Sequence, residues 1–303
     1  MKEIKTVGLI GLGAVGALYA ERLMASGADL RVIVDEGRKA RYQREGVLVN
    51  GVRVDFPYAV PDQAAPVDIL LVATKAGGLG AALETAAGFV GADTLLISLI
   101  NGVTSEGMMA ARFGDKNVLY AVAQGMDAVK EGNSLVYHQS GMIVLGEKEP
   151  GPVSARVQAA ADYLNAHGVK TMPVTDMVRR QWGKLVLNVG LNQATMVFEC
   201  DYSGVQRPGR PREVMISAMR EAQMIAGLEG YPISEEEFAG WVALADGLSP
   251  SGKPSMRQDG EAKRRSEVEL FAGTMVRLGK KHGVAVPVNE WLYERILKIE
   301  AAY

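Results

Sequence analysis

Short apolar runs alternate with amphipathic segments through the first half of the chain. Runs rich in Val, Ile and Leu predict strands over 6–10, 30–34, 68–74, 94–99 and 117–124, with helices beginning near Ala14, Lys39, Leu79 and Thr104. Strands separated by segments of helix length are typical of parallel strands joined by helical crossovers. The pattern therefore predicts an α/β fold with a doubly wound parallel sheet, the Rossmann arrangement.

The pattern changes after Gln124. Residues 134–139 and 142–145 flank Gly141 like a hairpin, which predicts an antiparallel extension, and 153–166 resumes a helical period. From Asp176 onward strand signals nearly vanish, and helices are expected over 176–198, 212–228, 235–245 and 261–281 and from Val288. We therefore expect two domains, a Rossmann domain over residues 1–175 and an all-helical domain over 176–303.

Composition narrows the class of protein. The 303 residues are 48% hydrophobic and 22% charged with a net charge of -2, as in an ordinary globular enzyme, so nucleic acid has no electrostatic support as a partner. A single cysteine, Cys200, excludes an internal disulfide. Because there is no second thiol and the three histidines (His138, His167, His282) are far apart in the sequence, no Cys/His metal site is expected. No cleavable leader and no run of about 20 apolar residues is evident, so we expect a cytoplasmic protein without a membrane partner.

A glycine motif follows the first predicted strand and opens the first predicted helix. In this context G-x-G-x-x-G is typical of dinucleotide binding. The first glycine permits the tight turn, the second lets a pyrophosphate approach the backbone, and the third lets helix pack against strand. A purely structural glycine turn is the alternative. The expected cofactor-binding loop comprises Gly11, Leu12, Gly13, Ala14, Val15 and Gly16.

The end of the second predicted strand bears on the choice between NAD and NADP. Asp35 stands 19 positions after Gly16, where an acid accepts hydrogen bonds from the ribose diol and repels a 2′-phosphate, which favours NAD. Arg38, Lys39 and Arg41 follow at once and could hold that phosphate. A third interpretation is a solvated basic helix start beside a capping aspartate. All three stay open on the sequence alone.

Two further polar residues end predicted strands, where an open α/β sheet places its ligand crevice. Lys75 follows the third strand and Asn101 the fourth. Both are candidate cofactor contacts. The alternatives are a surface cation for Lys75 and a turn dipeptide for Asn101-Gly102.

The helix predicted around Lys184 is apolar on nearly every side, so we expect it to be central and buried. Four residues advance a helix by about 40° and eight by about 80°, which places Lys184, Asn188 and Asn192 on one polar stripe. A buried ammonium and two amides need partners or a ligand. A substrate with a carbonyl and a carboxylate or hydroxyl would satisfy them, with Lys184 as general acid. The alternative is that Lys184 reaches the surface and the asparagines bond other helices.

Two other residues are candidates in the second half. Glu267 shares a predicted helical face with Phe271 and Met275, and a carboxylate on an apolar stripe suggests a site, although a structural ion pair is an equal competitor. Its expected work is to orient Lys184 or to accept a substrate hydroxyl. Ser255 is a candidate for binding the substrate carboxylate, or it caps a helix, since Ser255 and Gln258 are spaced as a capping box.

A set of motifs spread over nearly the full length matches one family. The motifs are the glycine loop, Thr74-Lys75-Ala76, Asn101-Gly102, the helix of Lys184, Asn188 and Asn192, Pro254-Ser255-Met256-x-Gln258-Asp259, Ser266-Glu267-Val268-Glu269 and His282-Gly283-Val284-Ala285-Val286-Pro287. Together they resemble those of the ketopantoate reductase (2-dehydropantoate 2-reductase) family, which makes pantoate for coenzyme A synthesis.

The resemblance implies a Rossmann domain, a helical domain like that of the 6-phosphogluconate dehydrogenase group, a cleft between them, and NADP as cofactor. It also implies that homodimers are common. By position it assigns the general acid to Lys184 and its acidic partner to Glu267. It further assigns substrate binding to Asn188, Asn192 and Ser255, and cofactor contacts to Lys75 and Asn101.

The chain departs from the family pattern at two points. Gln193-Ala194-Thr195 follows Asn192 where the family usually has proline, which bears on the shape of the substrate pocket. Asp35 stands where the family commonly carries an arginine for the 2′-phosphate. The leading hypothesis is NAD(P)H-dependent reduction of ketopantoate. One rival is a related dehydrogenase acting on another small 2-keto or hydroxy acid, and another is a non-catalytic dinucleotide sensor.

Overall fold

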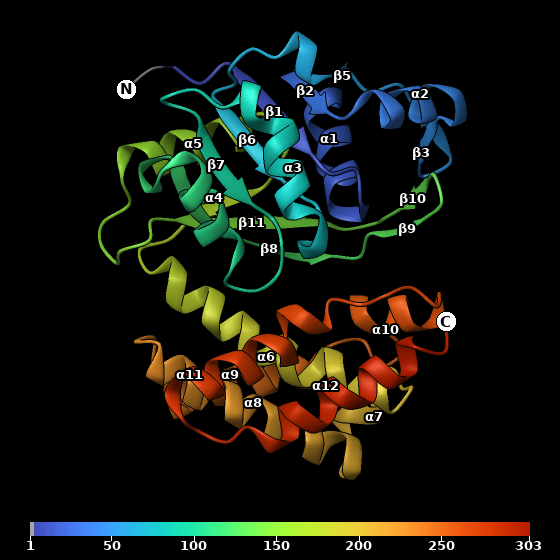
Figure 1. Ribbon diagram of the computed structural model, residues 1–303, viewed down its shortest axis with the longest axis vertical. Helices are drawn as coiled ribbons and strands as arrows, with labels where there is room; N and C mark the ends of the chain where they lie inside the picture. The colour runs from blue at the N-terminus through green and yellow to red at the C-terminus, as the bar shows by residue number, and fades with distance from the viewer. Residues whose placement is uncertain (1–2) are drawn as a thin grey trace. The chain divides into compact units, whose positions relative to one another are not determined.

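Two compact units make up the chain, one ending at Val178 and the other running from Arg179 to Tyr303. The computed structural model describes residues 3–303. In Figure 1 the first unit runs from blue to green and the second from yellow to red. No helix within the described part of the chain has both the length and the apolar character needed to cross a membrane.

The first unit is built on an eight-stranded sheet in the order β12-β11-β8-β7-β6-β1-β2-β5. Its strands from β5 to β8 are parallel, and β11 joins β8 antiparallel. The chain runs outward from β1 to β2 and returns to β6 on the other side of β1, so the strand order reverses there. The predicted doubly wound α/β sheet is confirmed. The strands are β1 (Thr6–Ile10), β2 (Asp29–Ile33), β5 (Tyr58–Ala59), β6 (Ile69–Val72), β7 (Leu95–Ser98), β8 (Val118–Met126), β11 (Ser140–Gly146) and β12 (Thr171–Pro173).

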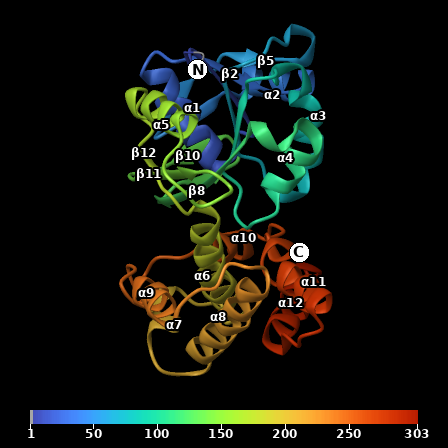
Figure 2. The same ribbon diagram turned by 90° about the vertical axis from the view of Figure 1, so that its left-hand side faces the viewer.

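Helices cover both faces of this sheet. Figure 2 shows α1 (Ala14–Ala25) and α5 (Ala155–Ala166) on one face and α3 (Leu79–Ala86) and α4 (Ser105–Phe113) on the other. On the first face Leu18 and Leu164 join one buried cluster with Leu9 and Val32 of the strands. A sheet covered on both faces needs apolar residues on both sides of its strands, which explains the continuous apolar runs in the sequence. The remaining helix, α2 (Glu36–Glu45), follows β2.

A second, four-stranded sheet was not expected from the sequence. It has the order β4-β3-β10-β9. The hairpin predicted around Gly141 is wrong, because β10 pairs with β9 and β3 whereas β11 pairs with β8. Gly141 instead lies within β11, where a Cβ would meet Gln124 O at 2.3 Å, so glycine permits close contact between strands. The strands are β3 (Val47–Val49), β4 (Val52–Val54), β9 (Val129–Glu131) and β10 (Ser134–Val136).

The described part of the second unit is helical, as predicted. One helix, α6, contacts most of the others: a Cβ at Gly183 would strike Trp241 of α9, one at Gly190 would strike Met215 of α8, and Met196 lies against Gly260 of α10. The single helix predicted over 261–281 is wrong, because the chain breaks after α10 and forms a 3-10 turn before α11 begins. The helices are α6 (Met177–Val197), α7 (Tyr202–Gln206), α8 (Arg210–Leu228), α9 (Glu235–Asp246), α10 (Ser255–Glu261), η5 (Val268–Leu270), α11 (Ala272–His282) and α12 (Pro287–Glu300).

Candidate functional site

The glycines of the loop between β1 and α1 have two different roles: two are required by protein packing, and one leaves room for a ligand. Gly11 has φ +101°, and a Cβ there would meet the backbone of Ala73 at 2.7 Å. A Cβ at Gly16 would meet Gly11 O at 1.8 Å. At Gly13, by contrast, the nearest atom to a Cβ is Ala73 O at 3.8 Å, so protein packing does not require glycine. The residue leaves the backbone open to a group from outside, as pyrophosphate binding needs.

The N-terminus of α1 completes this loop. Its N-cap is Gly13, which offers no side chain to the first amides, and its first turn holds no acidic residue. Ala14 and Val15 open the helix, and Leu12 in the loop is buried. Uncapped N–H groups at a helix start attract anions. The loop residues therefore fit a dinucleotide pyrophosphate.

The carboxyl ends of β1, β6 and β7 lie at one edge of the sheet. Ile10 pairs with Val72, and Val72 with Ser98, so the glycine loop, Lys75 and Asn101 all follow neighbouring strand ends. Lys75 is exposed and Asn101 half-buried. The structure thus brings these predicted cofactor residues to the edge where α/β sheets bind ligands.

Thr74 adds a group at this edge that the sequence had shown only as part of a motif. Its hydroxyl is buried and lacks a hydrogen-bond partner among the described residues. Its backbone N lies 2.7 Å from the ideal Cβ position of Gly11, so it borders the glycine loop. A buried hydroxyl that finds no protein partner is a candidate ligand contact.

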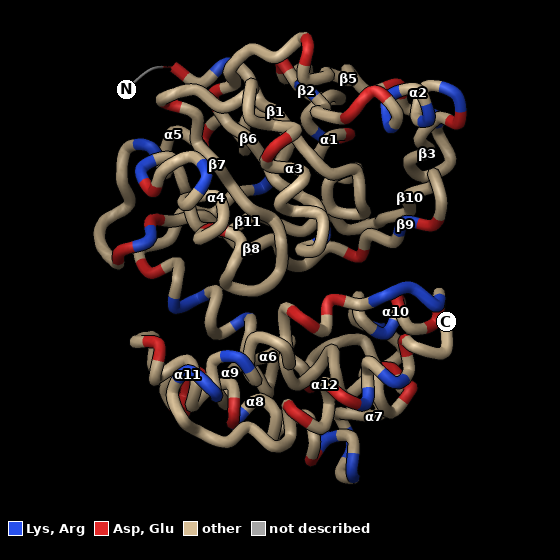
Figure 3. Tube along the Cα trace, in the orientation of Figure 1, with Lys and Arg blue, Asp and Glu red and all other residues tan. Residues whose placement is uncertain are grey.

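Asp35 caps α2 and pairs with Arg38. Its Oδ1 accepts a hydrogen bond from Arg38 N at 2.7 Å, and its Oδ2 pairs with the Arg38 guanidinium. The bond from the Arg38 backbone, followed by the guanidinium charge, lowers the pKa of Asp35, so it is ionised at neutral pH. Lys and Arg residues gather along α2 (Figure 3). The capping interpretation is confirmed, and the ribose-binding role of Asp35 and Arg38 stays a prediction.

On α6 the predicted polar stripe stands out from a buried helix. Its neighbours Leu185, Val186 and Val189 are buried. Lys184 and Asn188 are partly exposed, while Asn192 is 5% exposed. The stripe therefore carries an ammonium and two amides along one line of a largely buried helix, as the spacing predicts.

Burial changes the acidity of Lys184. Desolvation lowers the pKa of its ammonium to about 8, and the charge of Glu267 opposes this shift. An ammonium with this pKa can give up a proton near neutral pH, which an exposed lysine does far less readily. The interaction also places Glu267 within electrostatic reach of Lys184, although the sequence had assigned Glu267 to a helix. It is instead the partly buried residue before η5.

Ser255 occupies a different position from the one that the capping-box spacing predicts. The N-cap of α10 is Pro254, and Ser255 is the first helical residue. The Gln258 side chain donates to Lys253 O at 2.9 Å instead of reaching back to a cap. The capping box is therefore wrong, because proline before the serine shifts the helix start by one residue. Ser255 is exposed, and its role in substrate binding stays a prediction.

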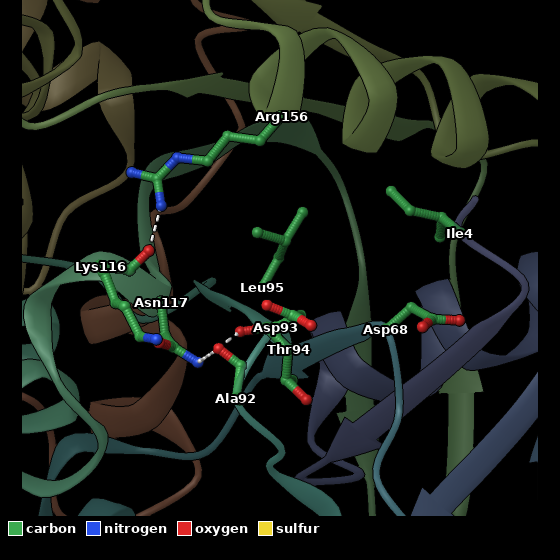
Figure 4. Close-up of a pocket in the computed structure, with 9 residues that line it drawn as sticks. All are labelled: Ile4, Asp68, Ala92, Asp93, Thr94, Leu95, Lys116, Asn117 and Arg156. Carbon is green, nitrogen blue, oxygen red and sulfur yellow. Dashed lines mark hydrogen bonds between the residues drawn. The ribbon is translucent and has the colours of Figure 1, made fainter. Parts of the chain in front are cut away.

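A pocket of about 300 Å³ lies at the opposite, amino-terminal edge of the large sheet. Figure 4 shows Ile4 and Leu95 in its lining, with Arg156 reaching the backbone of Lys116. Two of its charged side chains already bond the protein: Asp68 accepts from Thr6, and Arg156 pairs with Glu147. It contains none of the predicted site residues.

Comparison with known proteins places this geometry in a family. The model of the ketopantoate reductase PanE/ApbA family matches residues 7–150, and that of the C-terminal domain of the same family matches 176–300. The chain belongs to the ketopantoate reductase family. The protein is therefore an NAD(P)-dependent oxidoreductase with a nicotinamide dinucleotide as its cofactor, and the assignment of the glycine loop to that cofactor stays a prediction. Curated relatives include the 2-dehydropantoate 2-reductases of Archaeoglobus fulgidus, 27% identical over 99% of both chains, and Vibrio cholerae, 27% identical over 97% of this chain and 98% of that one.

Solved structures share the fold over almost the whole chain. A D-mandelate dehydrogenase in complex with NADH is 22% identical with a TM-score of 0.87, covering 98% of this chain and 99% of that one. A ketopantoate reductase of Ralstonia eutropha, also 22% identical, has a TM-score of 0.83 with the same coverage. The ketopantoate reductase of Staphylococcus aureus, 19% identical with a TM-score of 0.79 and again the same coverage, is described as dimeric.

Proposed function

We propose that this protein reduces 2-dehydropantoate (ketopantoate) to pantoate with a reduced nicotinamide dinucleotide. The observation that carries the proposal is the Lys184 ammonium, whose pKa burial lowers to about 8, on a stripe with two amides. A lysine pKa lowered in this way is not expected for a lysine exposed at the surface, and a stripe with a purely structural role would not require it. Relatives named 2-dehydropantoate 2-reductase support the substrate class.

The chemistry needs one proton from the protein. When bound, a reduced nicotinamide would supply the hydride that the keto carbon of the substrate needs. As that C–H bond forms, the carbonyl π electrons move to oxygen, and Lys184 Nζ donates a proton there, giving the secondary alcohol and a neutral amine. Solvent then returns the proton to the amine. An ammonium with a pKa of about 8 is protonated at pH 7 and still releases its proton readily.

The other residues of the second unit orient this step. Asn188 and Asn192 lie one and two helical turns beyond Lys184, so their amides can bond the hydroxyl and carboxylate groups of a bound keto acid. Glu267 favours the charged form of Lys184, and so it favours the return of a proton from solvent to the amine after each turnover. The exposed hydroxyl of Ser255 is assigned to the substrate carboxylate.

For the cofactor we infer a preference for NADH. Asp35 is ionised and sits after β2, where its oxygens keep free lone pairs that can accept the ribose hydroxyls. A 2′-phosphate would meet this negative charge. The Arg38 guanidinium, which could otherwise bind that phosphate, is paired with Asp35.

A second candidate is reduction of a different 2-keto acid, and the path of α6 favours it. A proline after Asn192 would remove one helical N–H and bend the helix. With Gln193 at that position, α6 continues to Val197. The placement of Asn192 can therefore differ from that in relatives with the proline, which would change the shape of the substrate site.

The test is oxidation of NADH and of NADPH by the purified protein with ketopantoate, 2-ketoisovalerate and benzoylformate. Ketopantoate should give the highest kcat/KM, and Lys184→Ala should abolish turnover while the protein still binds dinucleotide. A higher kcat/KM for another acid would replace ketopantoate with the second candidate. Tight dinucleotide binding without turnover of any acid would contradict both and favour a sensor.

A further inference from the structure

Gln193 is a fully buried amide on α6 that the reaction does not use. Its side chain is 0% exposed. It lies nine residues after Lys184 and one after Asn192, so it projects about 180° away from Lys184 and about 100° away from Asn192 around the helix. A buried amide costs stability unless its donors and acceptor are satisfied. Its partners therefore show what this unusual residue does.

The amide of Gln193 caps the start of another helix. Its Oε1 accepts a hydrogen bond from the backbone N of Ala272 at 3.1 Å. Ala272 is the first residue of α11, and its N–H has no partner within its own helix. Gln193 Nε2 donates to Val189 O at 2.7 Å, which holds the side chain along α6. The start of α11 is thus tied to α6 through one side chain.

The same amide extends into a network with α8 and α12. Gln193 Nε2 approaches Asn289 Oδ1 at 3.3 Å, and Asn289 is also 0% exposed. Asn289 Nδ2 donates to Glu221 Oε2 at 2.8 Å and to Ala218 O at 3.3 Å. Buried polar networks of this kind fix one arrangement of the packed helices, because any slip leaves several groups unpaired.

The tie at Ala272 lies close to Glu267 along the chain. Only η5 and Phe271 separate them, and this stretch is held by hydrogen bonds from Leu270 N to Glu267 O at 2.9 Å and from Phe271 N to Val268 O at 3.2 Å. A short, internally bonded segment transmits the position of one end to the other. The bond from Ala272 to Gln193 ties the start of α11 to α6, the helix that also carries Lys184. It therefore limits where Glu267 lies relative to Lys184.

We propose that Gln193 is a positioning residue that holds Glu267 beside Lys184 by capping α11 from α6. The proposal rests on the proposed function for its effect on turnover, but its effect on the Lys184 amine is independent of it. The charge of Glu267 acts on Lys184 and favours its protonated form. Moving Glu267 away should therefore make the ammonium more acidic.

The test variant is Gln193→Met, which keeps the volume and removes both hydrogen-bonding ends. Acetic anhydride labelling in competition with a free amine, followed by mass spectrometry, measures the titration of the Lys184 amine without turnover. We expect the Lys184 midpoint to fall by roughly half a pH unit or more, in the direction of Glu267→Gln. With a keto acid that the wild type reduces, kcat at pH 8 should fall roughly twofold or more, because the protonated fraction of Lys184 falls, while the KM for dinucleotide stays unchanged.

The matched control is Asn289→Leu, which breaks the network at α8 and α12 but leaves the bond from Ala272 to Gln193. It should lower the melting temperature by a similar amount without moving the Lys184 midpoint. The proposal is overturned if the midpoint stays at the wild-type value in Gln193→Met, or if Asn289→Leu moves it equally. If the wild type reduces no 2-keto acid, the proposed function fails, and the labelling still decides the positioning role.

A second variant covers the case in which Gln193→Met does not fold. Gln193→Glu keeps an acceptor oxygen for Ala272 but loses the Nε2 donor to both Val189 and Asn289. Because the bond to Ala272 is kept and any added charge is negative, this variant should not lower the Lys184 midpoint. A midpoint that falls as far in Gln193→Glu as in Glu267→Gln would overturn the proposal.

Discussion

The two units present their functional groups in different ways. In the first unit the backbone does most of the work: glycine geometry and uncapped helix amides form the candidate dinucleotide site, and few side chains need placing. In the second unit the site consists of side chains whose properties depend on packing, above all the lowered pKa of Lys184. A site made of backbone groups can therefore be predicted from a short sequence motif, whereas a site made of side chains depends on contacts between distant segments.

Replacing the central amine tests the second unit most strongly. In Lys184→Met we expect kcat to fall by roughly 10²- to 10⁴-fold, because the general acid is lost. The folded pKa of about 8 lies below the ordinary 10.5, so the unfolded chain binds more protons between these values and stability rises with pH there. Below pH 8 the buried ammonium costs about 2–3 kcal/mol, which methionine avoids. Stopped-flow kinetics and urea unfolding at pH 7 check both; a loss of stability together with unchanged kcat would contradict the account.

Alanine substitutions at two glycines of the loop should affect stability and dinucleotide binding separately in the first unit. Gly16→Ala places a Cβ 1.8 Å from Gly11 O, so we expect a loss of about 3 kcal/mol in unfolding free energy. Gly13→Ala has room within the protein and should change stability by less than about 0.5 kcal/mol. Its methyl group should weaken dinucleotide binding roughly tenfold, measured by fluorescence titration. Equal effects of the two substitutions on binding and stability would remove the distinction.

Asp35 combines a cap with a charge, and two variants separate them. Asp35→Asn keeps a capping side chain and removes the charge, so we expect the ratio of kcat/KM for NADPH to that for NADH to rise several-fold at near wild-type stability. Asp35→Ala should raise the ratio similarly and lose about 1 kcal/mol of stability. Steady-state kinetics with both dinucleotides gives the ratio. An unchanged ratio in both variants would remove Asp35 from cofactor selection.

The smallest effect is expected at Tyr19 of α1. Its side chain is 0% exposed, and its hydroxyl lacks a hydrogen-bond partner among the described residues. Burial alone raises the pKa of this phenol. Tyr19→Phe removes the unpaired hydroxyl, so we expect stability to rise by up to about 1 kcal/mol with dinucleotide binding unchanged. A loss of stability on thermal unfolding would show that the hydroxyl is bonded.

The sequence predicts the first unit well where its signals are local. β1 covers the predicted residues, and α1 and α3 begin at the predicted Ala14 and Leu79. Strand pairing between distant segments leaves no periodic signal, so the parallel pairing of β3 with β10 was missed and Gly141 was assigned to a turn.

In the second unit the helical spacing of Lys184 and Asn188 predicts their stripe, because it depends only on helix geometry. Glu267 was assigned to a continuous helix, since apolar spacing alone does not show the break between α10 and α11. Gln193 was visible only as a departure from a family pattern. Its partners at Ala272 and Asn289 follow from tertiary packing, which the sequence does not display.

The pH dependence of turnover tests the central claim most directly. Measured from pH 6 to pH 10 under saturating dinucleotide and keto acid, kcat should be high at neutral pH. It should fall tenfold for each unit above an apparent pKa near the value of about 8 for Lys184, because only the ammonium form donates the proton. A kcat that stays level to pH 10, or an alkaline fall that persists in Lys184→Met, would contradict the account.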